Sequence, residues 1–161
     1  MRVLMLCNGY PSSVEPYKGP FIREQVRWLK KLGHEVEVIR LVRINVSRIM
    51  VTPGPHLFRS WKVISQRLGT ERSGVVDGVS VHYPPVFVPP GRLFARLVPA
   101  LVKWQAGTVI QRVVRRFKPD IVHSHFLVPN VFIGEELARQ YGIPHVVSVM
   151  VSAATFGAAV G

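Results

Sequence analysis

A glycine stands directly before a proline, at the end of the loop that follows the first apolar stretch of the chain. The loop leads from Asn8-Gly-Tyr-Pro11 to Gly19, and a helix is expected to begin at Pro20. Glycine lets the backbone approach a ligand closely, and the free N–H groups of a helix start attract anions. The spacing indicates an anion-binding loop, with a plain turn glycine as the alternative. Arg23, one turn further, could meet a phosphate or belong to a solvated helix face.

A second group of polar side chains, His123, Ser124 and His125, follows two apolar residues. In α/β proteins, ligands bind in the crevice outside the carboxyl ends of parallel strands, so His125 is a candidate for contact with a substrate. The alternative is a loop histidine that is hydrogen-bonded for structural reasons. Ser124 could serve either purpose, and His123 is expected to point into the layer beside its strand.

The elements needed to position these residues alternate between strands and helices. Apolar runs predict strands at Val3–Leu6, Glu35–Leu41, Val79–Tyr83, Ile121–His123 and Ile143–Met150. Helical periodicity predicts helices at Pro20–Leu32, at roughly Leu93–Phe117 with Pro99 as a kink or as the true start, and at Asn130–Tyr141 with Asn130 as the N-cap. This order predicts an α/β, Rossmann-like fold, with a mostly parallel open sheet and helices on both faces.

Two details complete this assignment. Gly33 and Gly142 are expected to take the left-handed conformation that ends a helix. The stretch 45–78 is the hardest to assign, and one short helix is expected there at Phe58–Leu68.

Size and composition favour a single domain over residues 1–161. The chain has 161 residues, of which 48% are hydrophobic, which is enough to bury a core. Cys7 is the only cysteine, so the sequence offers neither a disulfide framework nor a thiolate zinc site. A reducing, cytoplasmic compartment fits this cysteine content. We expect neither a metal ion nor a cofactor.

The charge of the chain is strongly positive, with a formal net value of +12 at pH 7. Neither Asp nor Glu occurs at positions 38–70 or 78–119. Such a field attracts acidic lipid, nucleic acid or phosphorylated substrates, and a merely solvated basic face is the alternative. The aromatic residues in these basic stretches could touch a membrane or belong to the core; they are Phe58, Trp61, Phe87, Phe94 and Trp104.

Several short segments together resemble a known family. The first two are Asn8-Gly-Tyr-Pro11 with Lys18-Gly-Pro-Phe21, and Leu32-Gly-His-Glu-Val-Glu-Val38. The third combines Pro119-Asp-Ile-Val-His-Ser-His125 with Tyr141-Gly-Ile-Pro-His-Val-Val147. In this order and spacing they resemble the N-terminal, acceptor-side domain of retaining glycosyltransferases with the GT-B architecture, in the glycogen-synthase-like family four. The resemblance covers nearly the whole chain.

The resemblance implies that this domain holds the acceptor while a second domain holds the nucleotide-sugar donor. The loop at Gly19, with its neighbours Lys18 and Phe21, would face the donor diphosphate and the transferred sugar. The acceptor, a polysaccharide or a lipid-linked carbohydrate, would meet His125, Ser124 and Arg23. The full enzyme would be a cytoplasmic retaining hexosyltransferase, with peripheral contact at the inner face of the membrane.

The chain departs from the family pattern at two points. The family commonly has a histidine near the transferred sugar where this chain has Met150, which can neither donate a hydrogen bond to a sugar hydroxyl nor carry charge. The nucleotide-sugar domain, with its basic pair and spaced glutamates, is absent, so we expect the chain alone to be inactive. We expect either a domain cut from a longer protein or a shifted reading frame near the end. An exposed interdomain face would allow a homodimer.

Two other classes of function stay open at this point. One is a non-catalytic basic module that binds an acidic membrane surface or another polyanion. The other is a different enzyme on the same scaffold, such as a sugar-nucleotide epimerase or a dinucleotide enzyme. The first loop lacks G-x-G-x-x-G and no acidic residue ends the second strand, at Leu41-Val-Arg43, which argues against a dinucleotide. No nucleic-acid-binding module is recognisable, so we expect no specific nucleic acid.

Overall fold

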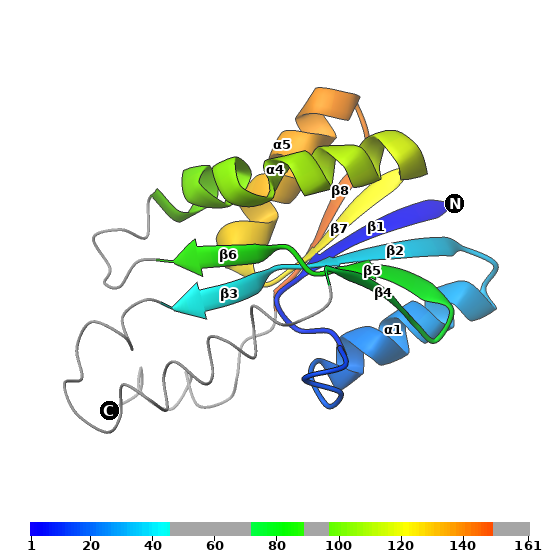
Figure 1. The fold of residues 1–161 in the computed structure, drawn as a ribbon. Coiled ribbons are helices and arrows are strands. Elements are labelled where there is room, and N and C mark those ends of the chain that lie inside the picture. Colours follow the sequence, from blue (N-terminus) through cyan, green and yellow to red (C-terminus); the bar gives the residue numbers. More distant parts are fainter. Residues whose placement is uncertain (46–71, 89–96, 150–161) are drawn as a thin grey trace, which may run out of the picture.

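A six-stranded sheet forms the centre of the computed structural model, which describes residues 1–45, 72–88 and 97–149 (Figure 1). In spatial order its strands are β4 (Ser73–Val76), β5 (Val79–His82), β2 (Glu35–Arg40), β1 (Arg2–Cys7), β7 (Ile121–His125) and β8 (His145–Ser148). Every neighbouring pair is parallel except β4 and β5. The mostly parallel open sheet predicted from the sequence is thereby confirmed.

Helices cover both faces of this sheet. Helix α1 (Pro20–Lys31) lies on one face, and α4 (Val98–Phe117) and α5 (Phe132–Tyr141) lie on the other (Figure 1). Side chains alternate along a strand, so Leu4 and Leu6 pack with α4 and α5 while Val3 and Met5 pack with α1. A strand covered on both faces must be apolar at every interior position, as β1 is. The doubly wound, Rossmann-like arrangement follows from this double burial.

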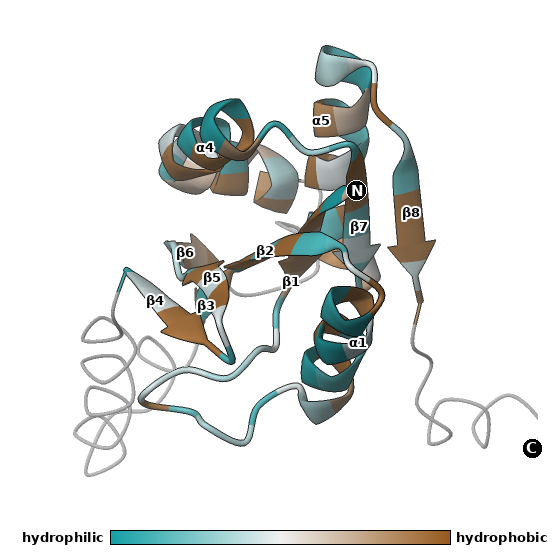
Figure 2. Ribbon diagram, turned by 90° about the vertical axis from the view of Figure 1, so that its right-hand side faces the viewer, coloured by the Kyte–Doolittle hydropathy of each residue, from teal (hydrophilic) through white to brown (hydrophobic). Residues whose placement is uncertain are grey.

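Each helix buries one side and leaves the other in water. In α1, Ile22 and Val26 are the buried residues. Figure 2 shows the hydrophilic colour over most of α1 and the hydrophobic colour concentrated in the strands. Gly33 and Gly142, with φ of 80° and 64°, end α1 and α5 in the left-handed conformation, as predicted.

A small second sheet was missed by the sequence analysis. Strand β3 (Val42–Asn45) pairs in parallel with β6 (Pro85–Val88). The proline pair was expected to end the preceding strand, but proline is tolerated as the first residue of a strand. From α4, the Gln105 side chain donates its Nε2 to the carbonyl oxygen of Phe87 at 3.1 Å and accepts the Phe87 N–H at 2.8 Å.

The hairpin of β4 and β5 was also half missed, because only β5 was expected. Its turn is Asp77-Gly78, with φ of 52° and 70°. Positive φ at both central residues matches the turn that joins two antiparallel strands with the right twist, and Asp-Gly is a preferred pair for it. The dipeptide could therefore have revealed β4.

Several predicted boundaries need correction. Helix α4 begins at Val98, so Pro99 lies in its first turn, which confirms the alternative of a later start. Strand β7 extends through His125, two residues further than expected. Helix α5 begins at Phe132, and Asn130 is not its N-cap: the Asn130 Nδ2 donates to the His125 carbonyl oxygen at 2.6 Å. The helix expected at Phe58–Leu68 lies outside the described residues.

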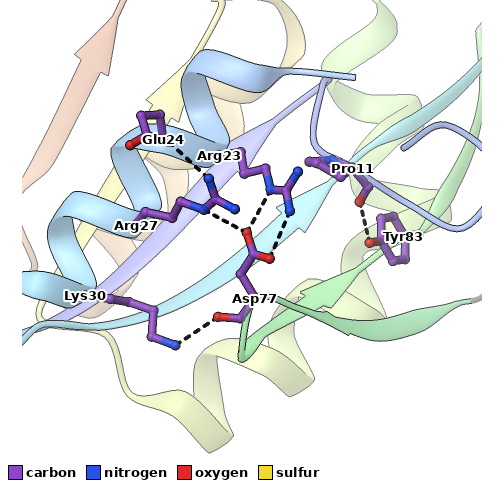
Figure 3. A network of polar contacts seen from close by, with 7 residues as sticks. All are labelled: Pro11, Arg23, Glu24, Arg27, Lys30, Asp77 and Tyr83. Carbon is purple, nitrogen blue, oxygen red and sulfur yellow. Dashed lines mark hydrogen bonds and ion pairs between the residues drawn. The ribbon is translucent and has the colours of Figure 1, made fainter. Parts of the chain in front are cut away.

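Asp77 fastens the hairpin turn to α1. Figure 3 shows its carboxylate between Arg23, whose Nε and Nη2 donate at 2.7 and 2.9 Å, and Arg27, whose Nε donates at 3.0 Å. The Lys30 ammonium donates to the carbonyl oxygens of Asp77 and Gly78 at 3.1 and 2.9 Å. The hydrogen bonds from Arg23, joined by those from Arg27, lower the pKa of Asp77 to about 2.

We predict that Asp77→Asn lowers the free energy of unfolding by about 1 kcal/mol at pH 7, because solvent screens this partly exposed cluster. The native pKa of Asp77 lies below its unfolded value, near 3.9. Its stabilisation is therefore present above pH 4 and lost as the pH falls toward 2. Urea unfolding of both proteins between pH 7 and pH 2 should show the difference shrinking.

Glu24→Gln is the matched control, because Glu24 is an exposed carboxylate on the same helix that accepts one bond from Arg27 at 3.3 Å. We expect a change within about 0.5 kcal/mol for this variant. Equal effects of the two substitutions would show that Asp77 has no special role in holding the hairpin.

Candidate functional site

The loops that follow β1 and β7, and the last residue of β2, meet at the carboxyl edge of the sheet. These three strands are neighbours and run parallel, so their carboxyl ends lie at one edge. In open α/β sheets this edge is where ligands bind. The predicted glycine loop and the predicted His-Ser-His segment are therefore brought to the same side of the molecule.

Gly19 occupies a position that only glycine can fill. Its φ and ψ are 66° and 48°, in the left-handed region. A Cβ at this position would overlap the carbonyl group of Gly9, whose carbon would lie 2.6 Å away. The two ends of the loop therefore touch backbone to backbone, and this contact sets the direction in which α1 begins.

The start of α1 is open to an anion. Gly19 is the N-cap, no side chain caps the helix, and the first turn contains no acidic residue. Pro20 has no N–H to satisfy. The positive end of the helix dipole and its free backbone donors therefore face the loop without an internal counter-charge from α1 itself.

Arg40 organises the loop, and the sequence analysis did not single it out. This last residue of β2 is 2% exposed. Its Nη1 donates to the Tyr10 carbonyl oxygen at 2.6 Å and to the Ser12 hydroxyl at 3.0 Å, and its Nη2 donates to the Glu15 carboxylate. Tyr83 adds a bond from its hydroxyl to the Pro11 carbonyl oxygen at 2.7 Å (Figure 3). A charged residue ending a buried strand was the available signal.

Lys18 is bound to the same carboxylate as Arg40. Its ammonium lies 3.0 and 3.2 Å from the two carboxylate oxygens of Glu15. Burial raises the pKa of Glu15, but the Lys18 hydrogen bonds and the Arg40 charge more than offset this and hold it below its usual value. Glu15 is therefore ionised at neutral pH and joins the two basic residues.

The remaining residues predicted near the loop are placed differently from one another. Phe21 lies edge-on to Phe126, with ring centroids 6.4 Å apart, and links the start of α1 to the residue after β7. Arg23 is held by Asp77 on the side of the hairpin. The structure brings Gly19, Lys18 and Phe21 together and ties Arg23 into the α1–hairpin contact.

Ser124 and His125 face opposite sides of the sheet, because neighbouring residues of a strand alternate. Ser124 lies toward α5 and is fully buried. Its hydroxyl donates to the Asn130 carbonyl oxygen at 3.1 Å and lies 2.9 Å from the Nε2 of His145. The donor and the acceptor of the Ser124 hydroxyl are thus both used within the fold. Ser124 and His125 do not form one contact surface.

His125 lies on the other side, beside His123. The two rings are 4.5 Å apart, and the His123 Nε2 lies 2.8 Å from the Ser148 hydroxyl. His125 is 3% exposed, and neither of its ring nitrogens has a hydrogen-bond partner among the described residues. Burial, assisted by the charge of His123, lowers the pKa of His125 to about 4. Its ring is therefore neutral at pH 7 and retains one donor and one acceptor.

The part of the chain that the structure describes contains no group of three or more His, Cys, Asp or Glu side chains placed to hold a metal ion. In the same residues, no helix is both long and apolar enough to cross a bilayer. The Cys7 thiol is fully buried in β1, and this burial raises its pKa to about 12, so it is not a nucleophile at neutral pH.

Comparisons with known proteins agree with this geometry. The family model of the glycosyl transferase 4-like domain matches residues 19–160. Over 156 residues the chain is 27% identical to a protein of Bacillus subtilis strain 168 whose name is "Putative teichuronic acid biosynthesis glycosyltransferase TuaC". The match covers 92% of this chain and 36% of that protein, so the chain spans about a third of its relative's length.

We predict that Gly19→Ala destabilises the protein by at least about 2 kcal/mol, because left-handed backbone strain adds to overlap with Gly9. The matched control is Gly142→Ala. Gly142 has nearly the same φ, 64°, but a Cβ there would meet nothing within 4 Å. Only the conformational cost of about 1 kcal/mol is expected for the control.

Chemical denaturation of both variants measures the difference. Equal losses of stability would mean that the Gly9–Gly19 contact relaxes easily and does not fix the loop.

Proposed function

The chain belongs to the family of glycosyl transferase 4-like domains, and on that basis we propose that it is the acceptor-binding half of a retaining glycosyltransferase. The complete enzyme moves a sugar from a nucleotide-diphosphate donor to a polysaccharide or lipid-linked acceptor. The observation that carries the proposal is the uncapped, positively polarised start of α1, with Gly19 at its N-cap and Lys18 beside it.

In this proposal the loop at Gly19 faces the donor diphosphate. Backbone N–H groups at a helix start stabilise the charge that develops on a leaving diphosphate, and Lys18 adds a full positive charge. Phe21 supplies an apolar edge beside them. Catalysis consists mainly of positioning the two substrates and of stabilising the leaving group.

The acceptor lies along the carboxyl edge, where His125 has two ring nitrogens without a hydrogen-bond partner among the described residues; both atoms are buried, so the acceptor reaches them only if the residues around His125 move aside. A neutral imidazole donates one hydrogen bond and accepts another, which suits a sugar hydroxyl. Ser124 has a structural role, because its hydroxyl is hydrogen-bonded to Asn130 and His145. The nucleotide part of the donor is held by a second domain, so the chain by itself does not complete the site.

We predict that purified residues 1–161 release no nucleoside diphosphate from UDP-, GDP-, ADP- or dTDP-sugars. The same residues joined to a C-terminal nucleotide-sugar domain of about 150–200 residues release it when acceptor is present. A coupled assay for nucleoside diphosphate tests both statements. Turnover by the isolated chain contradicts the division of labour, and a complete protein that is inactive with every donor and acceptor contradicts the proposal.

A second candidate function, contact with an acidic membrane surface, is favoured by a specific observation on α4. Trp104 in α4 is 81% exposed, and Phe87 in β6 and Leu97 at the start of α4 are 42% and 53% exposed. Arg112 and Arg115 follow on the exposed side of the same helix. An apolar patch followed by basic residues on one helix suits the boundary between acyl chains and anionic headgroups.

The position of this surface also suits a lipid-linked acceptor. Figure 1 shows α4 beginning on the side where β3 and β6 end, which is also the carboxyl side of the main sheet. Peripheral attachment through Trp104 would therefore bring the cytoplasmic enzyme's acceptor edge toward the inner face of the membrane.

We predict that Trp104→Ala weakens binding to phosphatidylglycerol-containing vesicles about tenfold, because the largest inserting side chain is lost. Trp28→Ala is the control, since Trp28 is 57% exposed but lies on α1, across the sheet. Vesicle co-sedimentation measures both variants. Equal losses, or no binding by the unaltered chain at low salt, would contradict a membrane surface on α4.

A further inference from the structure

A carboxylate of the protein itself occupies the most positive part of the loop after β1. The Glu15 carboxylate accepts hydrogen bonds from Arg40 and from Lys18, which are its side-chain partners among the described residues. Lys18 directly precedes Gly19, the N-cap of α1. The loop thus lies beside two cationic side chains and a helix start without an acidic residue. The Glu15 carboxylate is the negative charge that these cations bind.

The two ends of the Arg40–Glu15 pair differ in freedom. The Arg40 side chain is 2% exposed and is also fixed by Tyr10 and Ser12, whereas Glu15 and Lys18 are 31% and 37% exposed. Glu15 can therefore turn toward water, while Arg40 stays where it is. The Nε of Arg40 is buried without a hydrogen-bond partner among the described residues, so the guanidinium retains a donor.

A buried arginine without a counter-charge is strongly destabilising, which explains why an empty loop of this kind needs an internal anion. A phosphate group and a carboxylate make the same charge-assisted hydrogen bonds to arginine and lysine. The chemistry that holds Glu15 is therefore the chemistry that recognises a diphosphate.

We propose that Glu15 is a built-in competitor for a diphosphate, occupying the cradle of Arg40 and Lys18 when no donor is bound. Resting on the proposed donor role of this loop, the inference adds that binding of a diphosphate displaces the Glu15 carboxylate from Lys18 and from Arg40. The contact cancels one of the two positive charges of the empty cradle and weakens its affinity for free phosphate.

The test compares Glu15→Gln with Asp77→Asn in a titration with inorganic pyrophosphate, followed through the backbone amide resonances of Lys18 and Gly19. Each variant raises the net charge by one and removes a carboxylate bound to arginine. Only Glu15→Gln removes the negative charge from the cradle of Arg40 and Lys18. We expect this variant to bind pyrophosphate about tenfold more tightly than the unaltered chain, and Asp77→Asn to bind within twofold of it.

Equal or weaker binding by a folded Glu15→Gln variant overturns the proposal, as does equal tightening in Asp77→Asn. The unaltered chain provides a second measurement that needs no substitution. Saturating pyrophosphate should shift the carboxylate ¹³C resonance of Glu15, and a pyrophosphate complex that leaves this resonance unchanged also overturns the proposal. The proposal is also overturned if neither the unaltered chain nor Glu15→Gln binds pyrophosphate.

These readouts are separate from sugar transfer. Tighter binding by Glu15→Gln alongside an inactive complete protein would retain the anion cradle and reject the proposed enzyme. If the complete protein is active but pyrophosphate does not shift the Lys18 and Gly19 resonances, the proposed enzyme is retained and the anion cradle is rejected.

Discussion

Burial of β1 on both faces is the constraint from which the rest of the structure follows. Its residues Val3 to Cys7 are all buried, and they divide alternately between the core under α4 and α5 and the core over α1. β1 has a strand on each edge and helices over both of its faces, so only its two ends are uncovered. The loop at its carboxyl end is where backbone and polar side chains first become available to a ligand.

Much of this architecture could be predicted from the sequence, because it depends on runs of apolar residues and on helical periodicity, which are visible in the sequence. The apolar run of β1, the stripe of α1 and the left-handed Gly33 and Gly142 identified their elements. The failures have local causes. The predicted strand Glu35–Leu41 ended just before β3, which follows β2 after the single residue Leu41 and was not expected. Ser73–Val76 was too short a stretch to be recognised as β4.

The candidate site was less predictable than the fold, because it depends on contacts between residues far apart in the chain. Gly19 could be identified from its neighbours, but its contact with Gly9 could not. Arg40 stands 25 residues from Glu15, and no periodicity joins a strand end to a loop carboxylate. Conversely, the adjacent letters of Ser124 and His125 suggested a common role, and strand alternation separates them onto two faces. Proximity in sequence and proximity of side chains diverge most at strand ends.

The side chain of Gln105 has a consequence for association between molecules. An amide group carries the same donor and acceptor as a peptide unit, and here both are used on Phe87 in β6. At that residue the outer edge of the small sheet is already hydrogen-bonded, although no strand of the described residues lies there. A foreign strand that sought to extend this sheet would have to break two hydrogen bonds before it formed any, which protects the edge against aggregation. Among the described residues, the outer edges of β4 and β8 in the large sheet and of β3 in the small sheet have no strand beside them, so these are the edges open to another chain by strand addition.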